Sequence, residues 1–219
     1  MIRFTDIQQN TKIRTYIQKA DETLSVQGFT DHSFPHVTKV AVEAGEILRT
    51  MDYTEREAEL AQIAGFLHDI GNVVNRTAHA QTGALIAFRL LEDMGGDPEE
   101  IAAIITAVGN HDENTSAPVN PICAAVILAD KSDVRRTRVR NRDIATFDIH
   151  DRVNYAVSRS ALTINEARTE INLDLEIDTA HCAVMDYFEI FLTRMTLCRR
   201  AAEMLGLRFT LTINGHQLL

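Results

Sequence analysis

Histidine and aspartate residues recur in this sequence at helix ends or on otherwise apolar stretches. Imidazoles and carboxylates are costly to bury alone, so in such places they are either paired or bound to a metal. Nitrogen and oxygen donors of this kind suit iron, manganese, zinc or nickel. We therefore expect a site for divalent transition metals, whose candidate ligands are His36, His68, Asp69, His79, His111 and Asp130.

None of these six residues is informative alone, because a single histidine on an apolar helix face is more often a satisfied core residue than a ligand. The other four histidines carry no further signal, and we interpret them as surface or structural residues: His32, His150, His181 and His216. Asp112, beside His111, is equally well explained as a solvated turn residue.

Helices must hold the candidate ligands, and most of the first 140 residues carry helix signals. Apolar residues recur at three-four spacing over 33–51, which is typical of one buried helix face. Thr54 to Glu57 form a capping box, and prolines follow the candidate caps Asp97 and Asn120. These signals predict helices over 33–51, from 55 into His68 and Asp69, from about 77 to 94, from 98 to 109 and from 121 onward.

The period of the sequence changes after about residue 150. Apolar and polar residues alternate from Ile171 to Ile177, which predicts a half-buried strand, and its expected partner lies over 155–164. A long helix is expected from about Thr179 to Leu205, followed by a last strand over 207–213. The predicted fold is mainly α: a helical bundle with a small antiparallel β-sheet and a long helix at the C-terminus. The predicted domains are a helical metal-binding domain at 1–150 and an α+β appendage at 151–219.

The order of the candidate ligands resembles that of a known family. His36, then His68-Asp69, then Asp130 follow one another as in the HD superfamily of metal-dependent phosphohydrolases. The surrounding sequence is similar too, because Gly65 to Gly71 resembles the central helix of that family and Leu128 to Lys131 its closing aspartate segment. The resemblance implies an HD-type helical bundle with the activity of a metal-dependent phosphohydrolase.

Two further histidines, His79 and His111, resemble the additional ligands of the branch of this family that binds two metals. The likeness covers residues 36–138. It departs from the cyclic dinucleotide phosphodiesterases of the family, because no Gly-Tyr-Pro motif follows and a single histidine stands where those enzymes have a pair. The pattern is closer to the HD enzymes that hydrolyse symmetrical diadenosine tetraphosphate.

Hydrolysis of a phosphate ester needs charge neutralisation and a hydroxide, and two metals about 3.5–4 Å apart supply both. The resemblance implies how the ligands divide between two metals: His36, His68, Asp69 and Asp130 for one, His79 and His111 for the other, with Asp69 as the bridge. His68 and Asp69 are then the central catalytic pair, and the attacking group is a metal-bound hydroxide.

Cations follow the last candidate ligand in an otherwise acidic chain. Lys131 adjoins Asp130, and five arginines lie between residues 135 and 142. Because arginine forks suit phosphate, we expect Arg135, Arg136 and Lys131 to contact the phosphate of the substrate. The alternative is a solvated helix end on which these arginines pair with acids such as Asp133.

Two other functions remain open from the sequence. Some HD proteins use the same ligand order to hold two irons that activate dioxygen, and a regulatory module that holds a metal without turnover is also possible. A net charge of −9 argues against a nucleic-acid or membrane partner, and the polar first residues favour a cytoplasmic protein. The expected partners are a small-molecule phosphoester or nucleotide and a second copy of the chain bound through the C-terminal region.

Overall fold

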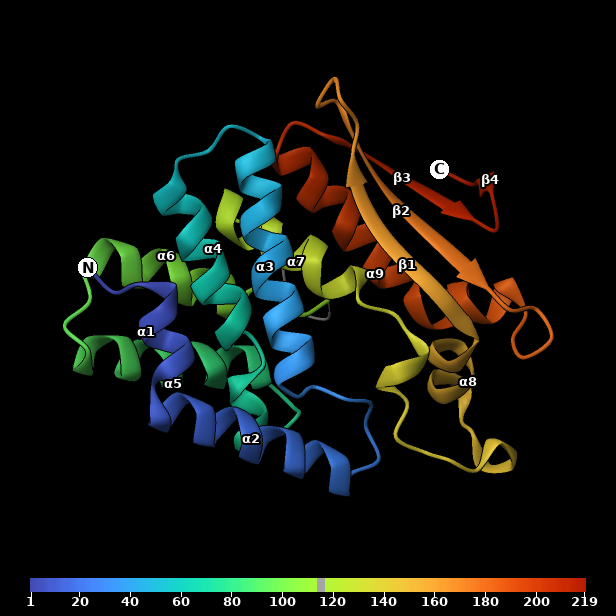
Figure 1. Ribbon diagram of the computed structural model, residues 1–219, viewed down its shortest axis with the longest axis horizontal. Helices are drawn as coiled ribbons and strands as arrows, with labels where there is room; N and C mark the ends of the chain where they lie inside the picture. Colours follow the sequence, from blue (N-terminus) through green and yellow to red (C-terminus); the bar gives the residue numbers. More distant parts are fainter. Residues whose placement is uncertain (114–116) are drawn as a thin grey trace.

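The computed structural model describes residues 1–113 and 117–219, and helices make up most of this part of the chain (Figure 1). The mainly helical fold with a small sheet and a long C-terminal helix is confirmed. In chain order the elements are α1 (Phe4–Gln9), α2 (Thr11–Val26), α3 (Phe34–Thr50), α4 (Glu55–Leu67), η1 (Ile70–Val73), α5 (His79–Asp93), α6 (Pro98–Gly109), α7 (Pro121–Ser132), η2 (Arg136–Arg138), η3 (Ile144–Thr146), α8 (Ile149–Ala156), β1 (Val157–Ile164), β2 (Glu170–Ile177), α9 (Val184–Met204), β3 (Arg208–Ile213) and β4 (His216–Gln217).

Three helices, α4, α6 and α7, begin where local capping chemistry predicts. The Thr54 side chain accepts a hydrogen bond from the backbone N–H of Glu57 at the start of α4. Asp97 caps α6 and Asn120 caps α7 in the same way, each just before a proline in the first helical turn. Each cap satisfies a backbone N–H that has no partner within its helix, so these boundaries are set by nearby residues.

Helix α7 lies at the centre of the molecule. Its residues from Ile122 to Ala129 are all buried, so this helix is apolar on every side rather than on one face. It packs against α3 and α4 from the N-terminal part and against α9 from the C-terminal part. Asp130, near its end, is therefore held by a rigid element that both parts of the chain surround.

The sheet is mixed, so the expected antiparallel arrangement is wrong for one of its strand pairs. The strand order is β1-β2-β3-β4, and β2 runs antiparallel to β1 but parallel to β3. The parallel pairing arises because α9 carries the chain back across the sheet between β2 and β3, as in a β-α-β unit. The turn at Asn214-Gly215, where both residues have positive φ, then adds the short antiparallel strand β4.

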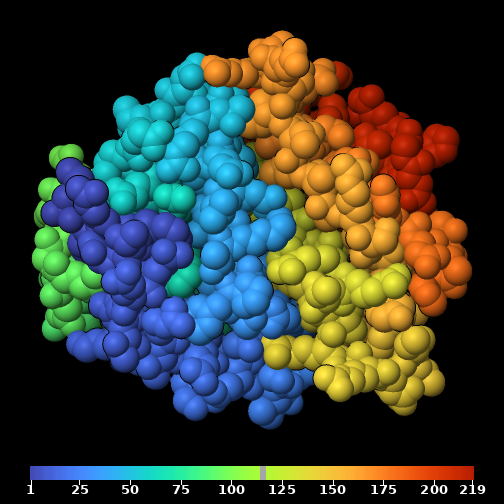
Figure 2. Space-filling view, in the orientation of Figure 1, coloured from blue at the N-terminus to red at the C-terminus, as the bar shows by residue number. Residues whose placement is uncertain are grey.

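One hydrophobic core runs through the whole described chain. It includes residues from the N-terminal helices, from α7, from the sheet and from α9. In the space-filling view the C-terminal segments lie directly against α3 and the segment after α7 (Figure 2). The division into domains at residue 150 stays a prediction. Within the described ranges, no helix is both long and apolar enough to cross a bilayer.

Candidate metal centre

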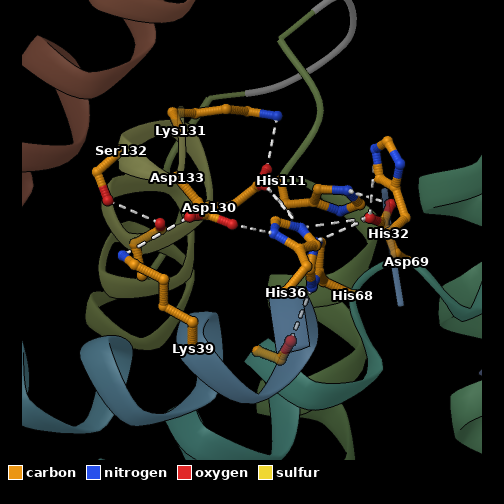
Figure 3. Close-up of polar contacts among 12 residues, drawn as sticks. His32, His36, Lys39, His68, Asp69, His111, Asp130, Lys131, Ser132 and Asp133 are labelled. Atoms are coloured by element: carbon orange, nitrogen blue, oxygen red, sulfur yellow. Dashed lines mark hydrogen bonds and ion pairs between the residues drawn. The ribbon is translucent and has the colours of Figure 1, made fainter. Parts of the chain in front are cut away.

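Five elements bring the candidate ligands together at one place in the bundle. The ligand positions are His36 in the first turn of α3, His68 and Asp69 directly after α4, His79 at the start of α5, His111 just after α6, and Asp130 near the end of α7. Figure 3 shows most of these side chains converging on Asp69 and Asp130. The four histidines and Asp69 are buried, whereas Asp130 is partly exposed.

The approach of α5 to Asp69 depends on a glycine. A Cβ atom on Gly71 would lie 2.0 Å from the backbone oxygen of His79 and 2.5 Å from the backbone nitrogen of Gly83. Only glycine therefore allows η1 and the first turn of α5 to pass this closely. Ala78, the residue before α5, adopts a left-handed backbone with φ 57°, a strained conformation that is common where a protein orients functional side chains.

Each candidate-ligand histidine is fixed by a hydrogen bond from its Nδ1 atom. The partners are Asp133 Oδ2 for His36 at 2.8 Å, Gly65 O for His68 at 2.7 Å, Arg76 O for His79 at 3.0 Å and Val108 O for His111 at 2.7 Å. Carbonyl and carboxylate oxygens only accept, so Nδ1 must donate. When the ring is neutral, Nε2 carries no proton, and its lone pair points into the centre. Metal-binding histidines require this orientation.

The first half of the centre is built around one oxygen of Asp69. Its Oδ2 atom lies 3.2 Å from Nε2 of His68 and 3.6 Å from Nε2 of His36. Oδ1 of Asp130 completes this half, at 3.4 Å from Nε2 of His36 and 3.6 Å from Nε2 of His68.

The second half faces the other oxygen of Asp69. Its Oδ1 atom lies 3.5 Å from Nε2 of His79 and 3.9 Å from Nε2 of His111. Asn72 also donates a hydrogen bond of 2.8 Å to Oδ1, which fixes the orientation of the carboxylate. Asp69 is thus placed between two sets of donor atoms, with one oxygen toward each.

The donor atoms fit divalent metal ions. Nε2 of His36 lies 3.3 Å from Nε2 of His68, and Nε2 of His79 lies 3.1 Å from Nε2 of His111. Two neutral rings whose lone pairs face each other this closely need a cation between them, either a proton or a metal ion. Metal–ligand bonds of about 2.0–2.2 Å allow ligand atoms on one ion to be at most about 4.4 Å apart. The potential ligand atoms form two groups within 4.8 Å: His36, His68 and Asp130, and His68, Asp69 and His111.

The charge state of these groups also suits metal binding. Burial alone would raise the pKa of Asp69, but nearby imidazoles, His68 foremost, hold that pKa well below its usual value. Burial likewise opposes ionisation of Asp130, and Lys131 lowers its pKa well below normal. Burial lowers the pKa of His111 well below the usual imidazole value, so this ring is neutral. Both carboxylates are therefore ionised, as ligands must be.

A chain of alternating charges links the centre to helix α9. The ammonium of Lys131 lies 2.7 Å from Oδ2 of Asp130 and 2.7 Å from Oε2 of Glu113. Glu113 accepts a hydrogen bond of 3.0 Å from Arg194 on α9. Lys131 thereby occupies one oxygen of Asp130 and leaves Oδ1 facing the histidines. The ammonium has a third N–H, so the expected contact of Lys131 with substrate stays a prediction.

A cavity of about 280 Å³ lies over the centre. Asp69, His79, His111 and Asp130 form part of its wall. The rest of the wall includes residues from α8 and α9, so the C-terminal region contributes to the cavity directly. The cations that line it are Arg76, Lys131, Arg138 and Arg194.

Arg135 and Arg136 do not line this cavity. Helix α7 ends at Ser132, so the two arginines are not on a continuing helix that could direct them back toward Asp130. Nε of Arg135 donates to Asp133 at 2.7 Å. Arg136 donates to the backbone oxygen of Tyr155 and stacks on its ring. Arg135 is therefore paired with an acid, Asp133, as in the alternative to a phosphate contact.

Several residues at the cavity were not predicted, among them Arg76, His32 and Arg194. Arg76 precedes His79 by three residues, and this proximity to a ligand could have indicated it. His32 precedes His36 by four residues, but it lies before the helix and therefore shares no helix face with it. Arg194 has no signal in the sequence, because only packing of α9 on α7 brings it to the centre.

The comparisons with known proteins agree with this geometry. A family model for the HD domain matches residues 33–152, which is more than half of the chain. No curated protein matches the sequence. The matched segment includes all six candidate ligands and ends within α8. The chain belongs to the HD domain family.

Proposed function

We propose that this protein is a metal-dependent hydrolase of a phosphate ester or phosphoanhydride, acting on a small-molecule phosphoester such as a nucleotide. The observation that carries the proposal is the position of Asp69, whose two oxygens face two separate sets of histidine nitrogens. Two divalent ions about 3.5–4 Å apart would stabilise both the attacking and the leaving oxygen of a phosphoryl group. The proposal extends to the cofactor: two divalent transition metals.

The ligands divide between the ions by distance. His36, His68 and Asp130 would hold one ion with Oδ2 of Asp69, and His79 and His111 would hold the other with Oδ1. Bound metals supply a water of lowered pKa and neutralise phosphoryl oxygens. The buried hydrogen bonds from the Nδ1 atoms keep the donor atoms in place, so little reorganisation is needed at each turnover.

Arg76 is the cation best placed to bind the phosphate of the substrate. Its side chain is 28% exposed and its Nη1 atom lies 3.7 Å from Oδ1 of Asp69. The same Nη1 atom is 3.3 Å from Asn72 Oδ1 and 3.4 Å from Nε2 of His79, so the N–H groups of Nε and Nη2 are the ones available to a ligand in the cavity. Arg194, on the α9 side of the cavity, supplies a second positive charge.

Metal analysis of the purified protein, followed by a screen of phosphoesters and nucleotides with the metal found, tests this proposal. Release of phosphate or of a nucleotide product, dependent on the metal, is the expected result. Dioxygen consumption is measured on the same samples with iron bound. Oxygen uptake without phosphoester hydrolysis would favour the oxygenase alternative, and bound metal with neither activity would favour a regulatory module.

Replacing Arg76 by alanine is expected to lower kcat/KM by about 10²-fold while metal content stays unchanged, because a preorganised charge at the phosphate is lost. Arg76→Lys should recover only part of the activity, since an ammonium lacks the planar fork of donors. Steady-state kinetics measures both effects. Arg142→Ala is the matched control, because this arginine is exposed and does not line the cavity. Equal losses in the alanine variants of Arg76 and Arg142 would contradict the assignment.

Metal affinity is expected to rise with pH. Burial lowers the pKa of His68, but Asp69 and Asp130 outweigh burial and raise that pKa to about 10 in the metal-free centre. Below that pH the ring holds a proton at the position of the metal, so binding must release it. Loss of one proton gives up to about a tenfold gain in affinity per pH unit. Chelator competition with Mn²⁺ between about pH 6.5 and 8.5 measures this slope, and a flat profile would contradict the prediction.

A further inference from the structure

A fifth imidazole faces the centre from outside the segment that the family model matches. His32 lies in the loop before α3, and its side chain is 11% exposed. Its Nε2 atom is 3.9 Å from Oδ2 of Asp69, the oxygen shared with His36 and His68. Figure 3 shows the His32 ring beside the carboxylate of Asp69, and its ring centroid lies 5.5 Å from that of His36. The interpretation of His32 as a surface or structural residue therefore misses its contact with the centre.

The His32 ring is oriented as the rings of the candidate ligands are. Its Nδ1 atom lies 2.7 Å from the backbone oxygen of Thr30. That oxygen only accepts, so Nδ1 donates and the lone pair of Nε2 is directed toward Asp69. At 3.9 Å the imidazole and the carboxylate do not share a hydrogen bond. Two acceptors therefore face each other across a gap that a cation can occupy.

The loop that carries His32 is anchored by side chains from distant parts of the chain. The backbone N–H of His32 donates to Asp21 on α2 at 3.1 Å. The residue before it, Asp31, forms two hydrogen bonds with Arg138. The backbone N–H of Asp31 donates to the backbone oxygen of Arg138 at 2.8 Å, and Nε of Arg138 donates to the backbone oxygen of Asp31 at 2.9 Å. These contacts hold the ring in position before any ligand binds, which is what a metal site requires of its side chains.

We propose that His32 is an additional ligand of the metal held by His36, His68, Asp69 and Asp130. The inference rests on the proposed metal-dependent function. The separation of 3.9 Å between Nε2 of His32 and Oδ2 of Asp69 lies within the span of about 4.4 Å that two ligand atoms on one ion can have. The first half of the centre then has five protein donors, and the second half has three.

The two halves of the centre differ in their number of protein donors, and this number determines which metal ions each half can bind. A structural zinc site takes four ligands in a tetrahedron, whereas manganese, iron, cobalt and nickel accept five or six. Five protein donors would therefore favour an ion that accepts five or six ligands over zinc in the first half. The second half, with three protein donors, keeps more positions open. Substrate exchange is thus expected mainly at the side of His79 and His111.

Cobalt substitution tests the proposal without measuring turnover. Protein loaded with one and with two equivalents of Co²⁺ is compared with His32→Ala and His32→Gln by visible absorption. Loss of a nitrogen donor is expected to shift the d–d bands in both variants and to weaken Co²⁺ binding by at least about tenfold. His150→Ala is the matched control, because His150 also lines the cavity but belongs to α8. Its spectrum should equal that of the unmodified protein.

The spectrum decides the outcome. Unchanged bands in both His32 variants overturn the proposal even if affinity falls, because the ring would then act only through hydrogen bonds. The same shift in His150→Ala also overturns it, since the bands would report any change in the cavity. Circular dichroism of the metal-free variants establishes that the helices are retained. Band shifts without hydrolysis of any phosphoester would leave His32 a ligand and reject the proposed function instead.

Discussion

Replacing Asp69 by alanine is expected to abolish binding of both metals and to reduce turnover by a factor on the order of 10³ or more. The reason is geometric, because the carboxylate of Asp69 contacts the histidines of both halves of the centre. His68→Ala is expected to have the same effect, since His68 approaches Asp69 and Asp130 in the first half and its ligand atom also lies within 4.8 Å of those of Asp69 and His111. The helical fold should remain, because the other helices are capped independently of these residues.

Metal analysis of the purified variants and steady-state kinetics on the identified phosphoester test this expectation. Asp69→Asn is informative beside the alanine variant, because it keeps the shape of the side chain and removes only its charge. Asp151→Ala serves as the control, since this carboxylate also lines the cavity but belongs to α8. Full metal occupancy with normal turnover in either Asp69→Ala or His68→Ala would show that the site has been assigned to the wrong residues.

The alanine variants of His79 and His111 are expected to keep about one metal and to lose most activity. Both rings contact Oδ1 of Asp69, whereas the first half is built on Oδ2 and on residues of α3, α4 and α7. Removing either ring should therefore empty the second half and leave the first in place. With one ion, the charge on the phosphoryl group is neutralised only in part, so the main effect falls on kcat.

Metal content per chain is the decisive measurement for these two variants. His181→Ala is the control from the C-terminal region, because His181 packs beside Tyr155 and lies 3.7 Å from Asp178 rather than at the centre. It should keep the full metal content. Unchanged metal content in both His79→Ala and His111→Ala would mean that the centre holds a single ion and that these histidines have a structural role.

The helix boundaries could be predicted because capping is local. Thr54, Asp97 and Asn120 each accept a hydrogen bond from a backbone N–H within three residues. The signal for β2 is equally local. Its residues from Ile171 to Ile177 alternate between buried and more exposed positions, as their apolar and polar side chains require. The sequence predicts that α9 starts at about Thr179, whereas the helix begins at Val184 after a turn.

The order of histidines and aspartates in the sequence determined the family and the candidate ligands, because each of these residues sits at the end or on the face of a locally encoded helix. Only the tertiary structure decided which cations reach the cavity. Arg135 lies close to Asp130 in sequence but pairs with Asp133, whereas Arg194 lies far along the chain and is brought in by α9. Side-chain direction depends on where the helix ends, and α7 ends at Ser132.

The parallel pairing of β2 with β3 and the contact of His32 with Asp69 were likewise decided by tertiary structure. An alternating strand pattern is the same for parallel and antiparallel neighbours, so the path of α9 across the sheet settles the direction. His32 stands outside the helix of His36, and no helical spacing relates the two. Its ring reaches the centre because Asp21 on α2 and Arg138 after α7, which are distant in sequence, hold its loop against Asp69.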